Sequence, residues 1–241
     1  MKKNFIYALA AFSMLAACKP EVKEVEEPKA TEDLSFYVKQ VQTALDRKDI
    51  PTALVNLNYV LGKDSTRQGL RDTLFFLYTE MQNTYGMANV GAEILKYRPN
   101  DLTILEPTAE AMKLNGEFGL AINIQEHIFG LTSDPRVKLM VAESYAYQQN
   151  IDKAEENIRW VIDNFSGKDT IKIERPMVSE QNRTQKIKMT AVAHQYLAQI
   201  YAETGQKAKA LSELDKALAI EPYYDLALVM KNELKFGKKR R

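Results

Sequence analysis

The chain has little of several residue types on which disulfide-linked, metal-binding and nucleic-acid-binding proteins depend. One Cys in 241 residues cannot form an internal disulfide, and one Cys with two His is too few for a His/Cys zinc site. The 10 Gly and 8 Pro are too few for a collagen-like or low-complexity chain and favour long helices. A formal net charge of +1 excludes a general basic field that would attract nucleic acid. With 45% hydrophobic residues, the chain is expected to fold.

The sequence also lacks the local motifs of common enzymes. It contains no Gly-rich phosphate loop, no His-Glu-x-x-His and no Gly-x-Ser-x-Gly. His127 and His194 lie far apart in the sequence and have no nucleophile pattern nearby, so we interpret both as structural. We therefore expect no enzymatic activity, no metal site and no cofactor.

The N-terminus has the three parts of a secretory signal. Lys2 and Lys3 precede a mostly apolar run of 13 residues, Phe5 to Ala17, which ends in small residues before Cys18. A transmembrane helix needs about 20 apolar residues, so this run is too short to span a bilayer. Residues 1–17 are therefore predicted to be a signal peptide.

The end of this segment, Leu15-Ala16-Ala17-Cys18, resembles the lipobox of bacterial lipoproteins. The resemblance implies that Cys18 is lipidated, becomes the first residue after cleavage and is then N-acylated with a palmitate-like chain. Two acyl chains hold a protein stably on a leaflet, whereas one binds only marginally. The expected localisation is the cell envelope, on the outer membrane facing the periplasm. The alternative is an ordinary signal peptide whose cleavage leaves Cys18 as a free thiol.

Two charged segments flank the remaining chain. Residues 18–33 begin with the lipidated Cys and are rich in Glu, which predicts an acidic flexible tether. Residues 237–241 form a basic tail that either contacts anionic lipid or is simply solvated. Without Lys2 and Lys3 the mature chain is close to neutral, so membrane attachment is expected to depend on the lipid.

A repeat of about 34 residues fills the region between these segments. Small or apolar residues recur in matching contexts at spacings of 34, 34, 33 and 56 residues, at Ala53, Met87, Ala121, Ala154 and Ala210. In the clearest copy, residues 191–224, Leu197 and Tyr201 lie one turn apart on one helical face. Gly205 interrupts the pattern before a second helical stripe. Each copy therefore predicts a helical hairpin.

This pattern resembles the tetratricopeptide repeat (TPR). The resemblance implies an all-α, right-handed superhelical solenoid of about five helix-turn-helix repeats within residues 34–236. A C-terminal capping helix is expected around Leu226 to Leu234. Some positions depart from the pattern: Phe75 replaces a small residue, and Thr108 and Gln125 replace apolar residues.

An insert at residues 169–190 separates the fourth and fifth copies. We expect a loop followed by a helix that Ser179 caps and that continues into the fifth repeat. The insert is either a solvated excursion or an auxiliary contact through Ile171, Ile173 and Met177.

In TPR proteins, five positions of the first helix in each repeat usually line a concave groove. Here the matching positions carry seven acids, including Asp46, against two bases, Lys113 and Arg136. Aromatic and amide side chains add stacking and hydrogen bonds. The predicted partner-binding residues are Asp72, Phe76, Glu80, Glu106, Glu110, Glu143, Tyr147, Gln195, Gln199 and Glu203. A basic or amide-rich extended segment is the expected ligand.

Two functions of different classes fit these observations. The first is a lipid-anchored scaffold or adaptor that binds protein segments in a cell-envelope assembly, as TPR lipoproteins do by family precedent. The alternative is an envelope protein that binds a glycan or another nonpeptidic ligand, which requires aromatic residues in the groove and an ordered insert.

Overall fold

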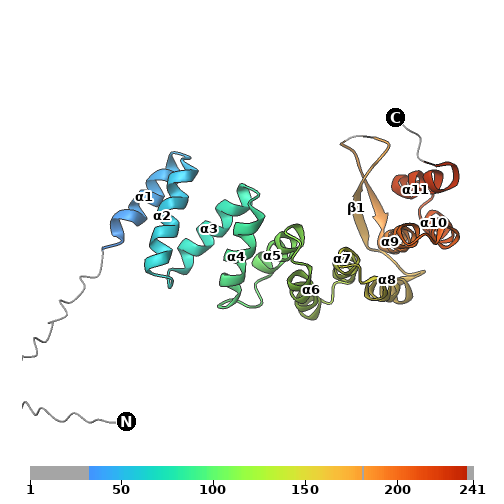
Figure 1. Cartoon of the computed structure of the whole chain (residues 1–241), viewed down its shortest axis with the longest axis horizontal. Coiled ribbons are helices and arrows are strands. Elements are labelled where there is room, and N and C mark those ends of the chain that lie inside the picture. The colour runs from blue at the N-terminus through green and yellow to red at the C-terminus, as the bar shows by residue number, and fades with distance from the viewer. Residues whose placement is uncertain (1–32, 181, 238–241) are drawn as a thin grey trace, which may run out of the picture. The chain divides into compact units, whose positions relative to one another are not determined.

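The computed structural model describes residues 33–180 and 182–237. The signal segment, Cys18 and residues 238–241 lie outside the described residues. From Ser35 onward the chain forms helices in sequence order, interrupted by one β-hairpin (Figure 1). Their bounds are α1 Ser35–Asp46, α2 Ile50–Lys63, α3 Gln68–Glu80, α4 Thr84–Leu95, α5 Leu102–Leu114, α6 Phe118–Thr132, α7 Pro135–Tyr147, α8 Ile151–Phe165, β1 Lys172–Pro176, β2 Thr184–Lys188, α9 Met189–Glu203, α10 Lys207–Ile220 and α11 Asp225–Phe236.

Helices α1 to α10 form five hairpins, and α11 packs on the last of them. Each helix packs mainly against its neighbours in sequence, as expected of a solenoid. Short polar residues begin several helices: Asp49, Asn83 and Asn150 accept backbone N–H groups of α2, α4 and α8. The predicted all-α solenoid of five repeats with a capping helix is confirmed.

The turn within each hairpin contains one residue in the left-handed region, where φ is positive. These residues occupy the same position in all five repeats: Lys48 (φ 59°), Gln82 (53°), Gly116 (81°), Gln149 (61°) and Gly205 (75°). Glycine adopts this conformation freely, whereas other residues do so at a cost. The common turn fixes the register of the first two repeats, where the sequence pattern is weakest.

Neighbouring residues accommodate two of the departures from the repeat pattern, Phe75 and Gln125. The large ring of Phe75 fits a position that is usually small because the facing residue of α4 is Gly91. Gln125 is fully buried, and its Oε1 accepts a hydrogen bond from Ser144 Oγ at 3.0 Å. Phe75 is therefore matched by a residue of its own hairpin, and Gln125 by a residue of the next hairpin.

The insert folds as a β-hairpin, so the predicted helix before Ala191 is wrong. β1 and β2 are antiparallel, with Ile173 opposite Ile187. Burial alternates along both strands, and Ile171, Ile173 and Ile187 pack on the core around α9. Ser179 does not cap a helix, because its hydroxyl donates to Asp225 at the start of α11. The alternation of apolar and polar residues from Ile171 was the period-two signal for a strand.

Candidate functional site

The predicted partner-binding residues belong to α3, α5, α7 and α9, the first helices of four hairpins. We call the surface formed by these first helices the A-helix face. Most of the predicted residues are at least partly exposed there; Phe76 and Tyr147 are 59% and 56% exposed. The structure distributes them over separate hollows, so they do not form a single uniform surface.

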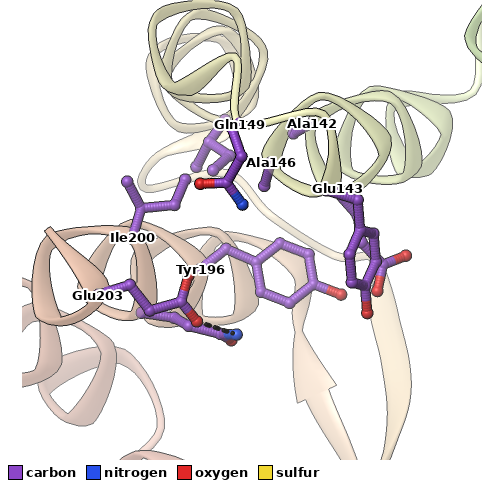
Figure 2. A pocket seen from close by; sticks show the side chains of 10 residues that line it. Ala142, Glu143, Ala146, Gln149, Tyr196, Ile200 and Glu203 are labelled. Carbon is purple, nitrogen blue, oxygen red and sulfur yellow. Dashed lines mark hydrogen bonds between the residues drawn. The ribbon is translucent and has the colours of Figure 1, made fainter. Parts of the chain in front are cut away.

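Four of the predicted residues come together in a groove of about 250 Å³ between α7 and α9. Glu143 and Tyr147 belong to α7, and Gln199 and Glu203 belong to α9. Figure 2 shows Glu143 and Glu203 on these two helices. The rest of the lining consists of the apolar side chains Ala142, Ala146, Ile158 and Ile200 and the polar side chains Gln149 and Tyr196. We call this hollow the α7–α9 groove. It offers carboxylates, two amides, aromatic rings and aliphatic surface.

Tyr196 is a lining residue of this groove that sequence reasoning missed. Its ring extends from α9 toward Glu143 in Figure 2. Arg175 of β1 donates a hydrogen bond from Nη1 to the Tyr196 hydroxyl at 3.1 Å, and its guanidinium lies 5.2 Å from the ring centroid. Burial raises the pKa of Tyr196, so the phenol stays neutral near pH 7. The insert therefore supports one wall of the groove.

A second hollow, of about 370 Å³, lies between α3 and α5 and contains Asp72 and Phe76. Arg98, from the turn between α4 and α5, forms an ion pair with Asp72. Pro107, inside α5, also lines the hollow. A neighbouring hollow is lined by Glu110 and Leu114 together with residues of the α3–α4 hairpin.

Several acids of the A-helix face are paired with cations. Lys113 Nζ lies 2.9 Å from carboxylate oxygens of both Glu110 and Glu143. Burial lowers the pKa of Lys113, but the hydrogen bonds that its ammonium group donates to these carboxylates outweigh burial and raise it, so Lys113 stays charged. Within the part of the chain that the structure describes, the ion pairs do not include Glu80, Glu106 or Glu203. Asp46 is also absent from these ion pairs, and Glu106 is close enough to Arg136 to raise the pKa of its guanidinium. The negative charge that is not neutralised by an ion pair is therefore smaller than the sequence count of seven acids.

The two histidines have local partners in the structure. His127 Nε2 lies 3.0 Å from Asn100 Oδ1 and 3.1 Å from the carbonyl oxygen of Pro99. His194 Nδ1 lies 2.6 Å from Glu213 Oε2 in the core between α9 and α10. Among the described residues, no cluster of His, Cys, Asp and Glu could hold a metal ion, and no helix is long and apolar enough to cross a membrane.

No protein-family model and no curated protein matches the chain. Among solved structures, it is similar to YrrB, described as a TPR protein with an unusual peptide-binding site, with a TM-score of 0.54, 17% identity and coverage of 84% of this chain and 100% of that one. A structure of MamA gives a TM-score of 0.52 at 14% identity and covers 86% and 97%. MamA from residue 41 onward, from Desulfovibrio magneticus RS-1, gives 0.50 at 16% identity and covers 81% and 99%.

The fold is a TPR solenoid.

In the last hairpin of the TPR solenoid, one of the predicted partner-binding residues does not lie on the surface. Gln195 was expected on the binding surface, but its side chain is fully buried. The capping helix α11 covers it: the Tyr224 hydroxyl donates to Gln195 Oε1 at 3.2 Å, and Gln195 Nε2 lies 3.5 Å from Met230 Sδ. Gln195 therefore joins the last TPR hairpin to its cap and is unavailable to a partner.

Proposed function

We propose that this chain is a lipid-anchored TPR scaffold that binds extended protein segments in a cell-envelope assembly through its A-helix face. The observation that carries the proposal is the presence of exposed aromatic and acidic side chains in hollows between first helices, with Phe76 in one and Tyr147 and Glu203 in another. Spaced hollows along one face suit successive side chains of an extended segment.

The anchoring part of the proposal is supported by the sequence alone. The short apolar segment before Cys18 and its lipobox-like end support lipidation and export. We place the anchor on the outer membrane, with the solenoid in the periplasm. A partner with basic residues is favoured by Glu80 and Glu203, which form no ion pair among the described residues.

The experiment is photocrosslinking in intact cells. A benzophenone amino acid replaces Phe76 or Tyr147 on the A-helix face, and Val55, an exposed residue of α2, serves as the matched control. Protein crosslinks identified by mass spectrometry at both A-helix positions, without the same bands at Val55, support the scaffold. Equal products at all three positions would contradict a partner-binding A-helix face.

A second candidate is binding of cell-wall glycan, which the structure favours in one respect. The two strands of the insert form a β-hairpin, and Arg175 of β1 binds the hydroxyl of Tyr196, which lines the groove together with a second tyrosine, Tyr147. Aromatic rings with amide and carboxylate groups also suit sugars. Retention of the purified protein on protein-free sacculi, without protein crosslinks in cells, would favour this candidate.

A further inference from the structure

We propose that the α7–α9 groove binds one Lys or Arg side chain of the partner segment, with the cation placed at Glu203. The inference rests on the proposed function and assigns the chemistry of one subsite. It follows from the distribution of charge in the groove, from the helix end at which Glu203 lies, and from the lining of the groove.

The charge of the groove is compensated at one end only. At the Glu143 end, Lys113 Nζ lies 2.9 Å from the Glu143 carboxylate, and Arg175 binds the Tyr196 hydroxyl. At the other end, Glu203 accepts a hydrogen bond from Gln199 Nε2 at 3.0 Å. Among the described residues, no ion pair involves Glu203. A cationic ligand is therefore attracted to the Glu203 end.

Glu203 also lies at the C-terminal end of a helix, where a carboxylate lowers the stability of the helix. It is the last residue of α9, and the last turn of this helix contains no basic side chain. The C-terminus of a helix carries a partial negative charge, which disfavours a carboxylate and favours a cation. A ligand cation at this place interacts favourably with both the carboxylate and the helix end. The first helices α1 and α3 end in the same way, in Asp46 and Glu80.

The lining of the groove suits the stem of a basic side chain. Ala146 and Ile200 provide aliphatic surface, and the Tyr196 ring lies between Glu143 and Glu203 in the view of Figure 2. Lys and Arg pack their methylene groups on such surface while the charged group stays near water, and the cation gains from a nearby aromatic ring. Arg175 fixes Tyr196, and Tyr147 stacks on Phe118 with ring centroids 5.4 Å apart. These contacts order the rings before a ligand binds, which reduces the entropic cost of binding.

The test is an NMR titration of the purified, ¹⁵N-labelled protein with N-acetyl-arginine amide and N-acetyl-lysine amide. N-acetyl-citrulline amide, which has the shape of arginine without its charge, is the matched ligand control. We expect saturable shifts of the backbone amides around Tyr147 and Glu203 with arginine or lysine, and at least fivefold weaker binding of citrulline. The comparison of the two basic amides shows which side chain the subsite prefers.

Glu203→Gln keeps the shape of the side chain and removes its charge. We expect it to weaken the binding of the basic amide at least fivefold, with an unchanged or slightly higher melting temperature because the acid at the helix end is gone. Asp163→Asn, which removes an exposed acid of α8 outside the groove, is the control and should leave the affinity unchanged.

Four results would overturn the inference. Two of them are equal binding of the citrulline amide and saturable shifts confined to other parts of the protein. Binding of an N-acetylglucosamine trimer with no response to the basic amides would assign the groove to a glycan, and a gain in arginine affinity on deletion of residues 238–241 would assign it to the chain's own basic tail. If photocrosslinks at Phe76 and Tyr147 persist while the basic amides fail to bind, the subsite is wrong and the scaffold function stands.

Discussion

Replacing Gly91 by Ala tests whether the large Phe75 of α3 and the small Gly91 of α4 are matched within their hairpin. Gly91 is buried in α4, and a Cβ added there would lie 3.0 Å from Phe75 Cε2 and well inside contact distance of Thr108 Oγ1. Thr108 is itself fully buried, so its side chain has little room to move. The substitution must therefore displace Thr108 or Phe75.

The expected magnitude combines two opposing effects. Overpacking of a core typically costs about 1–3 kcal/mol, whereas Ala in place of Gly within a helix stabilises by roughly 1 kcal/mol. The net expectation for Gly91→Ala is a loss of about 1 kcal/mol, or roughly 2–4 °C in melting temperature for a domain of this size. Gly130→Ala in α6 is the control, because an added Cβ meets nothing within 4 Å there. It should stabilise by up to about 1 kcal/mol.

The assay is urea and thermal unfolding followed by circular dichroism. Thr108→Ala removes the hydroxyl that Gly91→Ala would meet, and this hydroxyl has no hydrogen-bond partner among the described residues. We therefore expect the double variant to be more stable than the sum of the single effects predicts. If Gly91→Ala stabilises the protein as much as Gly130→Ala does, the proposed matching of Phe75 with Gly91 is wrong.

Three further predictions address the anchor, the turns and the insert. Cys18→Ser should release the protein from membranes or leave its signal uncleaved, because the thiol accepts the lipid; membrane retention of a correctly cleaved variant after a high-salt wash would contradict lipidation. Lys48→Gly should raise the free energy of unfolding by about 1 kcal/mol in urea denaturation, because Lys48 has a φ of 59°, and an unchanged or lower midpoint would count against strain at this turn. Burial raises the pKa of Asp225, but hydrogen bonds from Ser179 and the Val178 N–H outweigh burial and hold it below its usual value. The pKa of Asp225 is lower in the folded protein than in the unfolded chain. The stability that the Asp225 carboxylate contributes is therefore complete above roughly pH 4 and is lost as the pH falls through the folded pKa. Hydrogen exchange in residues 172–188, corrected for intrinsic rates, should accelerate in acid, and in the Asp225→Asn variant it should accelerate at neutral pH. Unchanged protection in that variant would refute the conclusion that Asp225 holds the insert on α11.

For the A-helix face, the sequence predicted which residues lie on the surface but not which of them form ion pairs. The positions of Asp72, Phe76, Tyr147 and Glu203 followed from the register of the repeat, because helical periodicity determines which residues share a face. Which of the acids form ion pairs did not follow from the register. The ion pair between Asp72 and Arg98 joins different elements and depends on how the turn after α4 is folded.

By itself the sequence determined the class of fold, the approximate number of hairpins and the register of the last three repeats. These properties arise from apolar spacings and turn residues within about 34 positions of one another, so they can be read locally. The tertiary structure alone decided that α11 buries Gln195, that the insert pairs as strands docked on Asp225, and that Arg175 supports Tyr196. Each of these contacts joins residues 21 to 46 positions apart in different elements, and only their packing in space brings them together.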